Sequence, residues 1–200
     1  MLIEFTLSNY KSFADPQSLS LVASKLKDKQ PGRVAQINNP QKTEILTSAM
    51  LLGKNGSGKS TLVEAMEFVR HFVRHSSSAS QEDDEIPVTP NLRDTSLRGK
   101  DTAIRVLFSV NEKIYQFEFS FNKNRIRNES LSVADKTSRF RKIYERILNE
   151  EQQEYLYSFS DDLKGEKSVW KSSTRGNALF LSTAVQLNAE QLREPFRWLT

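Results

Sequence analysis

The sequence contains no cysteine, which excludes disulfide bonds, zinc–thiolate sites and thiol catalysis. It has only two histidines, His71 and His75, and these leave little for a histidine-based metal site. No stretch approaches the roughly 18 to 20 apolar residues that span a bilayer. The first residues also lack the order of basic, apolar and small residues that marks a secretory signal. We therefore expect a cytoplasmic protein without membrane contact, whose chemistry relies on phosphate binding, hydroxyls and carboxylates.

The composition is that of an ordinary globular domain. With 200 residues, of which 37% are hydrophobic and 27% charged, the chain is long enough for one substantial core. Its 29 basic and 25 acidic residues form a mixed surface, although a net charge of +4 is compatible with nucleic-acid contact. The densest basic stretch, residues 139–146, is interleaved with Phe140, Ile143 and Tyr144. We favour the solvated face of an amphipathic element over a DNA contact there.

The N-terminal quarter has the pattern of short strands and loops. Apolar residues mixed with polar ones predict a strand in residues 2–13 and another in residues 19–24, with a turn at residues 15–16. Prolines, glycine and asparagines predict a loop over residues 25–42. The run from Ala49 to Leu52 is short and wholly apolar, and it leads directly into a glycine-rich segment. A buried central strand fits this run best.

An amphipathic helix and an exposed insertion follow. Apolar residues recur at spacings of three and four from Ser60 to His75, which predicts a helix with one face packed on a sheet. These residues are Leu62, Ala65, Met66, Val69, Phe72 and Val73. Residues 76–100 are rich in serine, acids and proline, so we expect an exposed insertion or loop. Its acidic run, Glu82 to Glu85, lacks the ligand spacing and the turn glycine of a calcium loop.

The pattern of residues 102–160 predicts an antiparallel β region. Two alternating segments are separated by Asn111 and Glu112, which is the pattern of a hairpin with one buried face. The aromatic residues of its second strand could form a base-stacking platform, but aromatics at a spacing of two more often belong to a core. Further strands are expected near residues 130–134 and 154–158, and a helix over residues 189–198.

The segment Gly53 to Thr61, GKNGSGKST, matches the P-loop pattern G-x-x-x-x-G-K-[ST] and carries an additional glycine, Gly56. A short apolar run precedes it and the amphipathic helix follows, as a P-loop requires. Backbone N–H groups that turn inward at the start of a helix form a concave anion site. Glycines leave no Cβ near the phosphates and allow positive φ angles. We favour nucleotide binding over the alternative, a glycine-rich turn that only connects a strand and a helix.

Each residue type in the motif has a distinct expected role. We expect Lys59 to reach the β- and γ-phosphates, Ser60 to coordinate Mg²⁺ through its hydroxyl, and Thr61 to donate to the α-phosphate. ATP and Mg²⁺ are therefore the expected cofactors. Lys59 is also a predicted catalytic residue. The predicted nucleotide-binding residues of the loop are Asn55, Gly56, Ser57, Gly58, Lys59, Ser60 and Thr61.

The P-loop and the opening of the chain together resemble a known family. The motif GxNGxGKST, preceded by a β-rich start that contains the segment Asn9 to Phe13 (NYKSF), resembles the N-terminal half of ABC-type ATPase heads of the SMC, RecF and OLD-like group. Within that group it looks closest to AAA/ABC-type ATPases of bacterial abortive-infection and anti-phage systems. The resemblance implies an α/β P-loop NTPase fold. It implies an ABC-ATPase-like N-terminal lobe with an antiparallel β subdomain, in a single domain of residues 1–200.

The resemblance adds two candidate site residues outside the P-loop. In the family, a basic residue at the end of the first strand lies beside the nucleotide, which implies a phosphate contact for Lys11. An ordinary exposed lysine is the alternative. Gln186, in the run LFLSTAVQLN, corresponds by the resemblance to the Q-loop glutamine, which helps to order Mg²⁺ and the attacking water. Gln186 is thus a predicted catalytic and metal-binding residue, with a surface glutamine as the alternative.

Two elements of such ATPases are missing from the sequence. The family needs an aspartate–glutamate pair at the end of an apolar strand, and an LSGG-like signature that completes the site of a second head. We expect the carboxylates of residues 83–85 and 161–162 to follow no apolar strand, and we assign them no role. The chain stops at Thr200, just past Gln186, where the family begins a helical excursion. The resemblance therefore implies part of a longer head or a naturally short protein.

The leading hypothesis is an ATP-binding, Mg²⁺-dependent ATPase lobe that works in anti-phage defence or DNA maintenance. The expected partners are a second copy of the chain or a complementing ATPase half. A nuclease or other effector partner follows from family analogy alone. The second hypothesis is a module that binds ATP without hydrolysing it and regulates a partner. A P-loop kinase for small molecules fits poorly, because a long antiparallel β region follows the first helix.

Overall fold

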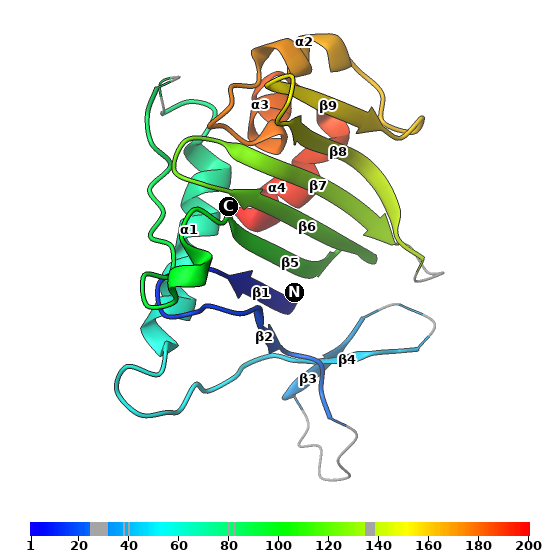
Figure 1. The fold of residues 1–200 in the computed structure, drawn as a ribbon. Helices are drawn as coiled ribbons and strands as arrows, with labels where there is room; N and C mark the ends of the chain where they lie inside the picture. Colours follow the sequence, from blue (N-terminus) through cyan, green and yellow to red (C-terminus); the bar gives the residue numbers. More distant parts are fainter. Residues whose placement is uncertain (25–31, 38, 40, 80, 82, 135–138) are drawn as a thin grey trace.

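The fold is built around a seven-stranded sheet (Figure 1). The computed structural model describes residues 1–200 except 25–31, 38, 40, 80, 82 and 135–138. The strands lie in the order β2-β1-β5-β6-β7-β8-β9, and all neighbours are antiparallel. Their bounds are Leu2–Ser8 (β1), Gln17–Ser20 (β2), Thr102–Val110 (β5), Lys113–Phe121 (β6), Ile126–Ala134 (β7), Arg141–Asn149 (β8) and Glu154–Phe159 (β9). The β region of residues 102–160 therefore shares one sheet with the N-terminus.

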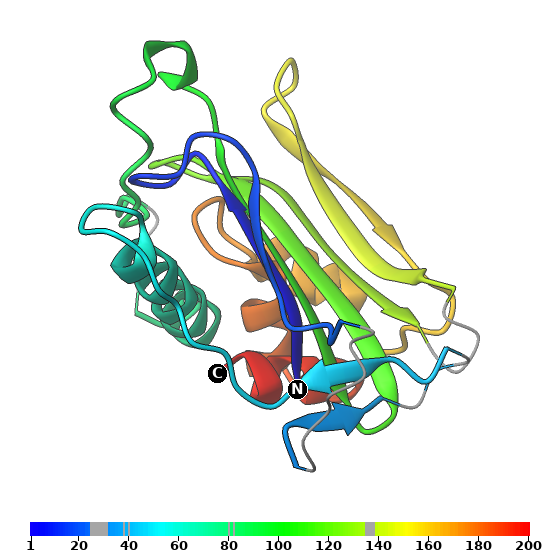
Figure 2. The same ribbon diagram turned by 90° about the horizontal axis from the view of Figure 1, so that it is seen from below.

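Helices α1, α3 and α4 pack on one face of this sheet and form the main core with it (Figure 2). The helical segments are α1 (Lys59–His75), η1 (Thr95–Leu97), α2 (Lys167–Ser173), α3 (Phe180–Gln186), η2 (Glu190–Leu192) and α4 (Arg193–Leu199). The predicted amphipathic helix is confirmed, because its buried residues are Leu62, Ala65, Val69, Phe72 and Val73. Among the described helices, none is long and apolar enough to cross a membrane.

The hairpin of β5 and β6 forms as its alternating sequence predicts. The two strands pair over their full length. Both turn residues have left-handed backbones, with φ 47° at Asn111 and φ 64° at Glu112, as a two-residue type I′ turn requires. Phe117, Phe119 and Phe121 of β6 are buried in the main core. These aromatic side chains are therefore core residues, and the base-stacking alternative is wrong.

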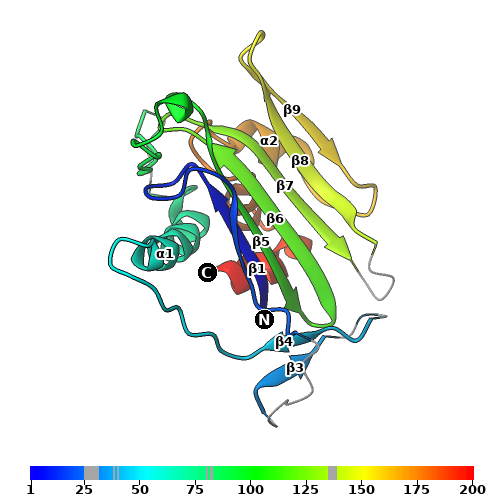
Figure 3. The ribbon, with the colours of Figure 1, turned by 60° about the horizontal axis from the view of Figure 1, so that its bottom comes forward.

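A second, two-stranded sheet packs against one end of the large sheet (Figure 3). Its antiparallel strands are β3 (Val34–Gln36) and β4 (Glu44–Leu46). It meets the large sheet in a separate small core, formed by Ile3, Ile37, Ile45, Ile114 and Ala134. The predicted loop of residues 25–42 is therefore wrong at β3, because pairing with β4 and burial of Ile37 outweigh the local turn composition. Residues 25–31, 38 and 40 of that prediction lie outside the described residues.

The apolar run from Ala49 to Leu52 is not a buried strand, so this prediction is wrong. Met50 and Leu52 are 82% and 83% exposed. A strand needs a neighbour for its N–H and C=O groups, and no strand of the described part of the chain pairs with this run. The run is hydrophobic, but no described strand lies beside it to bury its side chains. The segment is an exposed, non-helical lead into the P-loop.

The segment of residues 76–100 lies partly inside the fold, which corrects the expectation of a wholly exposed insertion. Ile86 and Val88 are buried in the main core. The Ile86 N–H donates to the Lys123 carbonyl at 2.7 Å, which ties the segment to the turn after β6. The polar composition of the segment conceals these few apolar anchors. Glu82 of the predicted acidic run lies outside the described residues.

An ion pair lies inside the core. Glu129 of β7 and Arg146 of β8 have fully buried side chains, with Nη1 3.8 Å from Oε2. The Glu129 carboxylate accepts the backbone N–H groups of Phe180 and Leu181, at 2.6 and 2.9 Å, where α3 begins. Arg146 donates to two carbonyls of the segment before α3. The basic stretch of residues 139–146 is therefore not only a solvated face, because its last residue is part of the core.

Candidate nucleotide-binding site

The P-loop joins the exposed apolar lead to the N-terminal end of α1 (Figure 1). Gly56 has φ 79° in the loop and Gly58 has φ 93°. Both values lie in the left-handed region that glycine adopts without steric cost. Gly58 is the N-cap residue of α1. Two glycines of the motif are therefore required where the loop turns and where the helix begins.

The first turn of α1 presents free N–H donors. The first intrahelical bond of this end runs from the Leu62 N–H to the Gly58 carbonyl at 3.0 Å. The N–H groups of Lys59, Ser60 and Thr61 precede it and have no acceptor within the helix. The first turn carries no acidic residue, and the N-cap offers no side-chain acceptor. Together with the helix dipole, these donors make the end of α1 a site for anions.

The Lys59 side chain folds back over the P-loop. Its ammonium group donates to the carbonyls of Gly53 and Lys54, both at 2.8 Å, and to the Ser57 hydroxyl at 3.4 Å. These contacts place the positive charge of Lys59 at the loop, where it would bind an anion together with the backbone N–H groups. Ser60 and Asn55 are exposed beside it. The predicted P-loop residues are thus brought together by the loop and the first turn of α1.

The turn after β1 lies against this loop. The Ser12 hydroxyl donates to the Thr61 hydroxyl at 3.1 Å. The ring of Phe13 contacts the backbone of Gly58 so closely that a Cβ there would stand 2.9 Å from Cζ. Lys11 lies in the same turn, with a left-handed backbone at φ 48°. The structure therefore places the turn that carries Lys11 next to the P-loop, and the phosphate contact of Lys11 stays a prediction.

Asn9 fixes the conformation of this turn. Its side chain is buried and its backbone has φ 49°. The amide nitrogen donates to the carbonyls of Lys100 and Asp101 at 2.8 and 3.3 Å, and the amide oxygen accepts the Asn91 N–H at 3.0 Å. The Thr102 hydroxyl donates to the Asn9 carbonyl at 2.7 Å. Asparagine tolerates the left-handed region better than most residues, so this residue type suits both the backbone and its bonds.

Glu64 of α1 is a site neighbour that the sequence reasoning missed. Its Oε2 lies 2.6 Å from the Lys11 ammonium nitrogen. The hydrogen bond to this carboxylate raises the pKa of Lys11 above its ordinary value. The signal was present in the spacing, because Glu64 follows Thr61 by three residues and so lies on the same side of the helix. Only the position of the Lys11 turn shows which residue it faces.

The structure does not bring Gln186 to the P-loop. Gln186 is the exposed last residue of α3. This helix contacts the far end of α1, where the Ser182 hydroxyl donates to the Val73 carbonyl at 2.5 Å. Val73 follows Lys59 by 14 positions (73 − 59), which is about 21 Å along a helix. Figure 1 likewise shows α3 beside the upper end of α1 and the P-loop at the lower end. This arrangement does not support a role for Gln186 in ordering Mg²⁺ or water.

The described acidic residues form no metal-binding cluster, and two carboxylates of the acidic runs are paired with cations away from the P-loop. Among the described residues, no group of three or more His, Asp or Glu side chains could hold a metal ion. Asp162 comes shortly after the edge strand β9, which forms where a strand is predicted near residues 154–158 and alternates between exposed and half-buried residues. Its carboxylate pairs with Arg141 at 2.6 Å, on the opposite edge of the sheet from β1. Glu85 lies 3.8 Å from Lys123, outside the P-loop.

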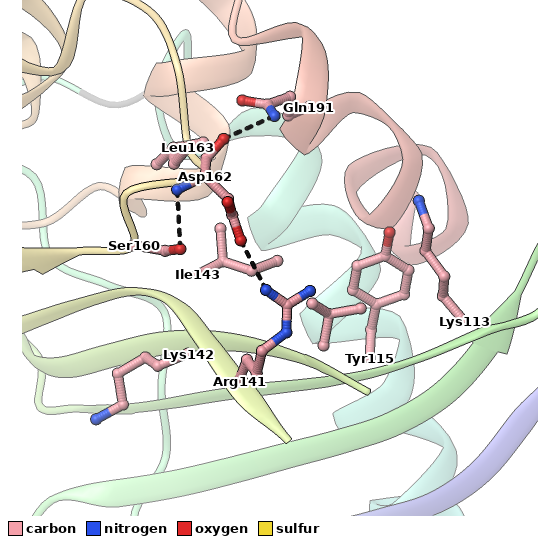
Figure 4. A pocket seen from close by; sticks show the side chains of 10 residues that line it. Lys113, Tyr115, Arg141, Lys142, Ile143, Ser160, Asp162, Leu163 and Gln191 are labelled. Carbon is pink, nitrogen blue, oxygen red and sulfur yellow. Dashed lines mark hydrogen bonds and ion pairs between the residues drawn. The ribbon is translucent and has the colours of Figure 1, made fainter. Parts of the chain in front are cut away.

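A cavity of about 250 Å³ lies away from the P-loop, between the start of β8 and η2 (Figure 4). Part of its wall is apolar and is formed by Val133, Ile143 and Leu163. Its cations are each paired with a carboxylate, in the pairs Arg141–Asp162, Lys113–Glu194 and Lys142–Glu145. Because these charges are already neutralised, the cavity is poorly suited to a triphosphate. We assign it no part in nucleotide binding.

Comparison with known proteins identifies the family. The family described as "AAA domain, putative AbiEii toxin, Type IV TA system" matches residues 48–200, from just before the P-loop to the last residue. The chain belongs to this AAA family. The predicted resemblance to an AAA ATPase of abortive-infection type is therefore confirmed. No curated protein matches the sequence.

Membership in this AAA family also gives the coarse fold class and indicates nucleotide binding. An AAA domain is a P-loop NTPase, and the structure shows a mixed α/β fold whose large sheet is antiparallel. AAA ATPases generally bind ATP with Mg²⁺. Nucleotide binding is thus the activity that family and geometry indicate together, because the helix end with free N–H donors lies within the matched residues.

Proposed function

We propose that this protein binds Mg²⁺–ATP on its P-loop and acts as an ATPase head in abortive infection or another form of anti-phage defence. The observation that carries the proposal is the P-loop, where the first turn of α1 presents N–H donors and the Lys59 ammonium group lies against the loop that leads into this turn. Such a combination of dipole, N–H groups and one lysine suits a polyphosphate better than a single carboxylate, since each donor can bind a separate oxygen.

The side chains of the P-loop fit the predicted division of roles. Lys59 needs only to leave the carbonyls of its own loop to reach the β- and γ-phosphates. The hydroxyl of Ser60 is a suitable single ligand for Mg²⁺, which keeps several waters and binds phosphate oxygens. Bound there, the ion would neutralise charge that develops on the phosphates. Lys11 adds a second cation at the edge of the site, from a turn that Asn9 holds in place.

We propose that hydrolysis needs a second copy of the chain or a complementing ATPase half. The part of the chain that the structure describes places no carboxylate cluster at the P-loop to polarise water. The exposed side chains of Met50 and Leu52 lie directly before the P-loop. A strand from a partner could pair with this run and bury its apolar side chains. Contacts with a nuclease effector or with nucleic acid stay predictions.

The test compares Lys59→Ala with Lys54→Ala, which removes the same charge from the same loop at a position that the motif leaves open. We expect the Lys59 variant to bind Mg²⁺–ATP at least about tenfold more weakly, because hydrogen bonds to charged groups contribute about 1.5–3 kcal/mol. The Lys54 variant should bind as the wild type does. Binding is measured by calorimetry and folding by circular dichroism. Equal ATP affinity of all three folded proteins would refute the proposal.

A second candidate function is an ATP-binding regulatory module without hydrolysis. It is favoured by the absence of a carboxylate cluster among the described residues. The two functions differ in phosphate release when a complementing half is added at saturating ATP. Release that depends on Lys59 supports the ATPase head. Binding without any release, even with that half present, supports the regulatory module.

A further inference from the structure

Lys11 lies where it can serve two acceptors. Its ammonium nitrogen is 2.6 Å from Oε2 of Glu64, and both side chains are partly exposed, at 38% and 50%. Glu64 stands one turn beyond Thr61 on α1, about 4.5 Å further along the axis. A phosphate held by the first turn of α1 would therefore lie close enough for the Lys11 side chain to reach it by a change of rotamer.

Several contacts hold the backbone of the turn in place, so we expect the lysine side chain to be the part that moves. The Lys11 N–H donates to the Thr89 carbonyl at 2.8 Å, and the Ser12 hydroxyl contacts Thr61. Phe13 packs on Gly58. Lysine has a flexible four-carbon stem, which lets its charge change partners without a backbone change.

We propose that Glu64 holds Lys11 away from the phosphate site, and that nucleotide binding transfers this lysine from the Glu64 carboxylate to the phosphates. This inference rests on the proposed function, and it assigns Glu64 the role of a residue that lowers ATP affinity. The direction follows from charge. A polyphosphate attracts Lys11 more strongly than Glu64 does, because it carries several negative charges. It must nevertheless displace the Glu64 carboxylate from Lys11 and bind close to that negative charge, and this lowers the ATP affinity.

The expected size of the effect is modest, because the pair is exposed. Exposed ion pairs contribute up to about 1 kcal/mol, so release of Lys11 should tighten ATP binding about two- to fivefold. A purely structural role of the pair predicts the opposite, since loss of the contact would loosen the Lys11 turn and weaken binding. The sign of the change therefore separates the two roles.

The experiment measures Kd for Mg²⁺–ATP in wild type, Glu64→Gln, Glu67→Gln, Lys11→Ala and the double variant Lys11→Ala/Glu64→Gln. Glu67 is an exposed carboxylate further along α1, so its variant controls for the loss of one negative charge. We expect tighter binding for Glu64→Gln alone. In the Lys11→Ala background, Glu64→Gln should have no further effect. Thermal unfolding checks that all variants fold.

Three results would overturn the inference while leaving the proposed function intact. They are unchanged or weaker binding by Glu64→Gln, equal gains from Glu64→Gln and Glu67→Gln, and a gain that persists without Lys11. In each of these cases the wild type would still bind ATP in a Lys59-dependent manner. If the wild type itself binds no ATP, the proposed function fails and this inference fails with it.

Discussion

The aromatic ring of Phe13 lies against the backbone of Gly58, so that a Cβ added at residue 58 would stand 2.9 Å from Cζ of the ring. This contact joins the turn after β1 to the residue that begins α1. The glycine therefore has two reasons to be glycine. Its φ of 93° disfavours any side chain, and the space that a side chain would take is filled.

The first prediction follows from this contact. Gly58→Ala should weaken Mg²⁺–ATP binding about tenfold or more, because distortion of the loop by about 1.4 kcal/mol corresponds to a factor of ten. Gly99→Ala is the matched control, since Gly99 also has a positive φ, 76°, but no atom lies within 4 Å of the position that its Cβ would take. Calorimetry gives both affinities. Equal affinities in the two variants would mean that the Phe13 contact does not shape the site.

The second prediction concerns the buried amide of Asn9. Asn9→Ala leaves the buried Asn91 N–H and the half-buried bond to the Lys100 carbonyl without their partner, and an unsatisfied buried group costs about 1–3 kcal/mol. We expect lower stability in urea unfolding and weaker ATP binding, because the turn that carries Lys11 loosens. Asn188→Ala is the control, as Asn188 also has a left-handed backbone, at φ 66°, but is exposed. An Asn9 variant no less stable than this control would contradict the proposed anchoring.

The sequence predicts the elements whose information is local. The helix of α1, the β5–β6 hairpin and the P-loop each depend on neighbouring residues, through a spacing of three and four, an alternation of two, and a run of glycines. The contacts of the site depend on residues far apart in the chain. Lys11 and Glu64 meet only because β1 ends beside the start of α1, and no periodicity records that meeting. Family resemblance supplied the place of Lys11, but not its partner.

The core ion pair is another contact between distant residues that the local sequence does not predict. Charge near Arg146 predicts a solvated face, since an arginine is rarely buried without a partner. That partner, Glu129, lies on the adjacent strand β7, and the α3 N–H groups that complete its bonds come from still further along the chain. Pairing between strands decides such a burial. The prediction of a buried strand at residues 49–52 is wrong for a related reason, because hydrophobicity alone does not provide a neighbouring strand.

The third prediction tests the Glu129–Arg146 pair. Removal of one partner from a buried pair leaves an uncompensated charge and costs about 3–5 kcal/mol. We therefore expect Glu129→Gln and Arg146→Met each to lower the free energy of unfolding by about that amount, measured in urea. The double variant should lose less than the sum of the two, because no charge is then left alone. Asp162→Asn, which breaks an exposed pair with Arg141, should change stability by about 1 kcal/mol or less.

Strictly additive losses in the double variant would contradict the coupling of this pair. A loss for Glu129→Gln as small as that for Asp162→Asn would show that the carboxylate is not buried as the structure describes. Near-ultraviolet circular dichroism adds a local readout, because Tyr144 donates its hydroxyl to Glu129 at 2.8 Å. Its signal should change in the Glu129 variant before the backbone unfolds.

The last prediction distinguishes a buried strand from an exposed lead before the P-loop. Leu52 is 83% exposed and Leu62 is 8% exposed, although they are separated only by the P-loop. In the chain of residues 1–200, Leu52→Ala should change the free energy of unfolding by about 0.5 kcal/mol or less, whereas Leu62→Ala should cost about 2–5 kcal/mol. Urea unfolding measures both. A loss at Leu52 equal to that at Leu62 would mean that residues 49–52 are buried by a neighbour after all, as their sequence alone predicts. A small loss at Leu52 would leave its apolar surface free for the partner strand that we propose.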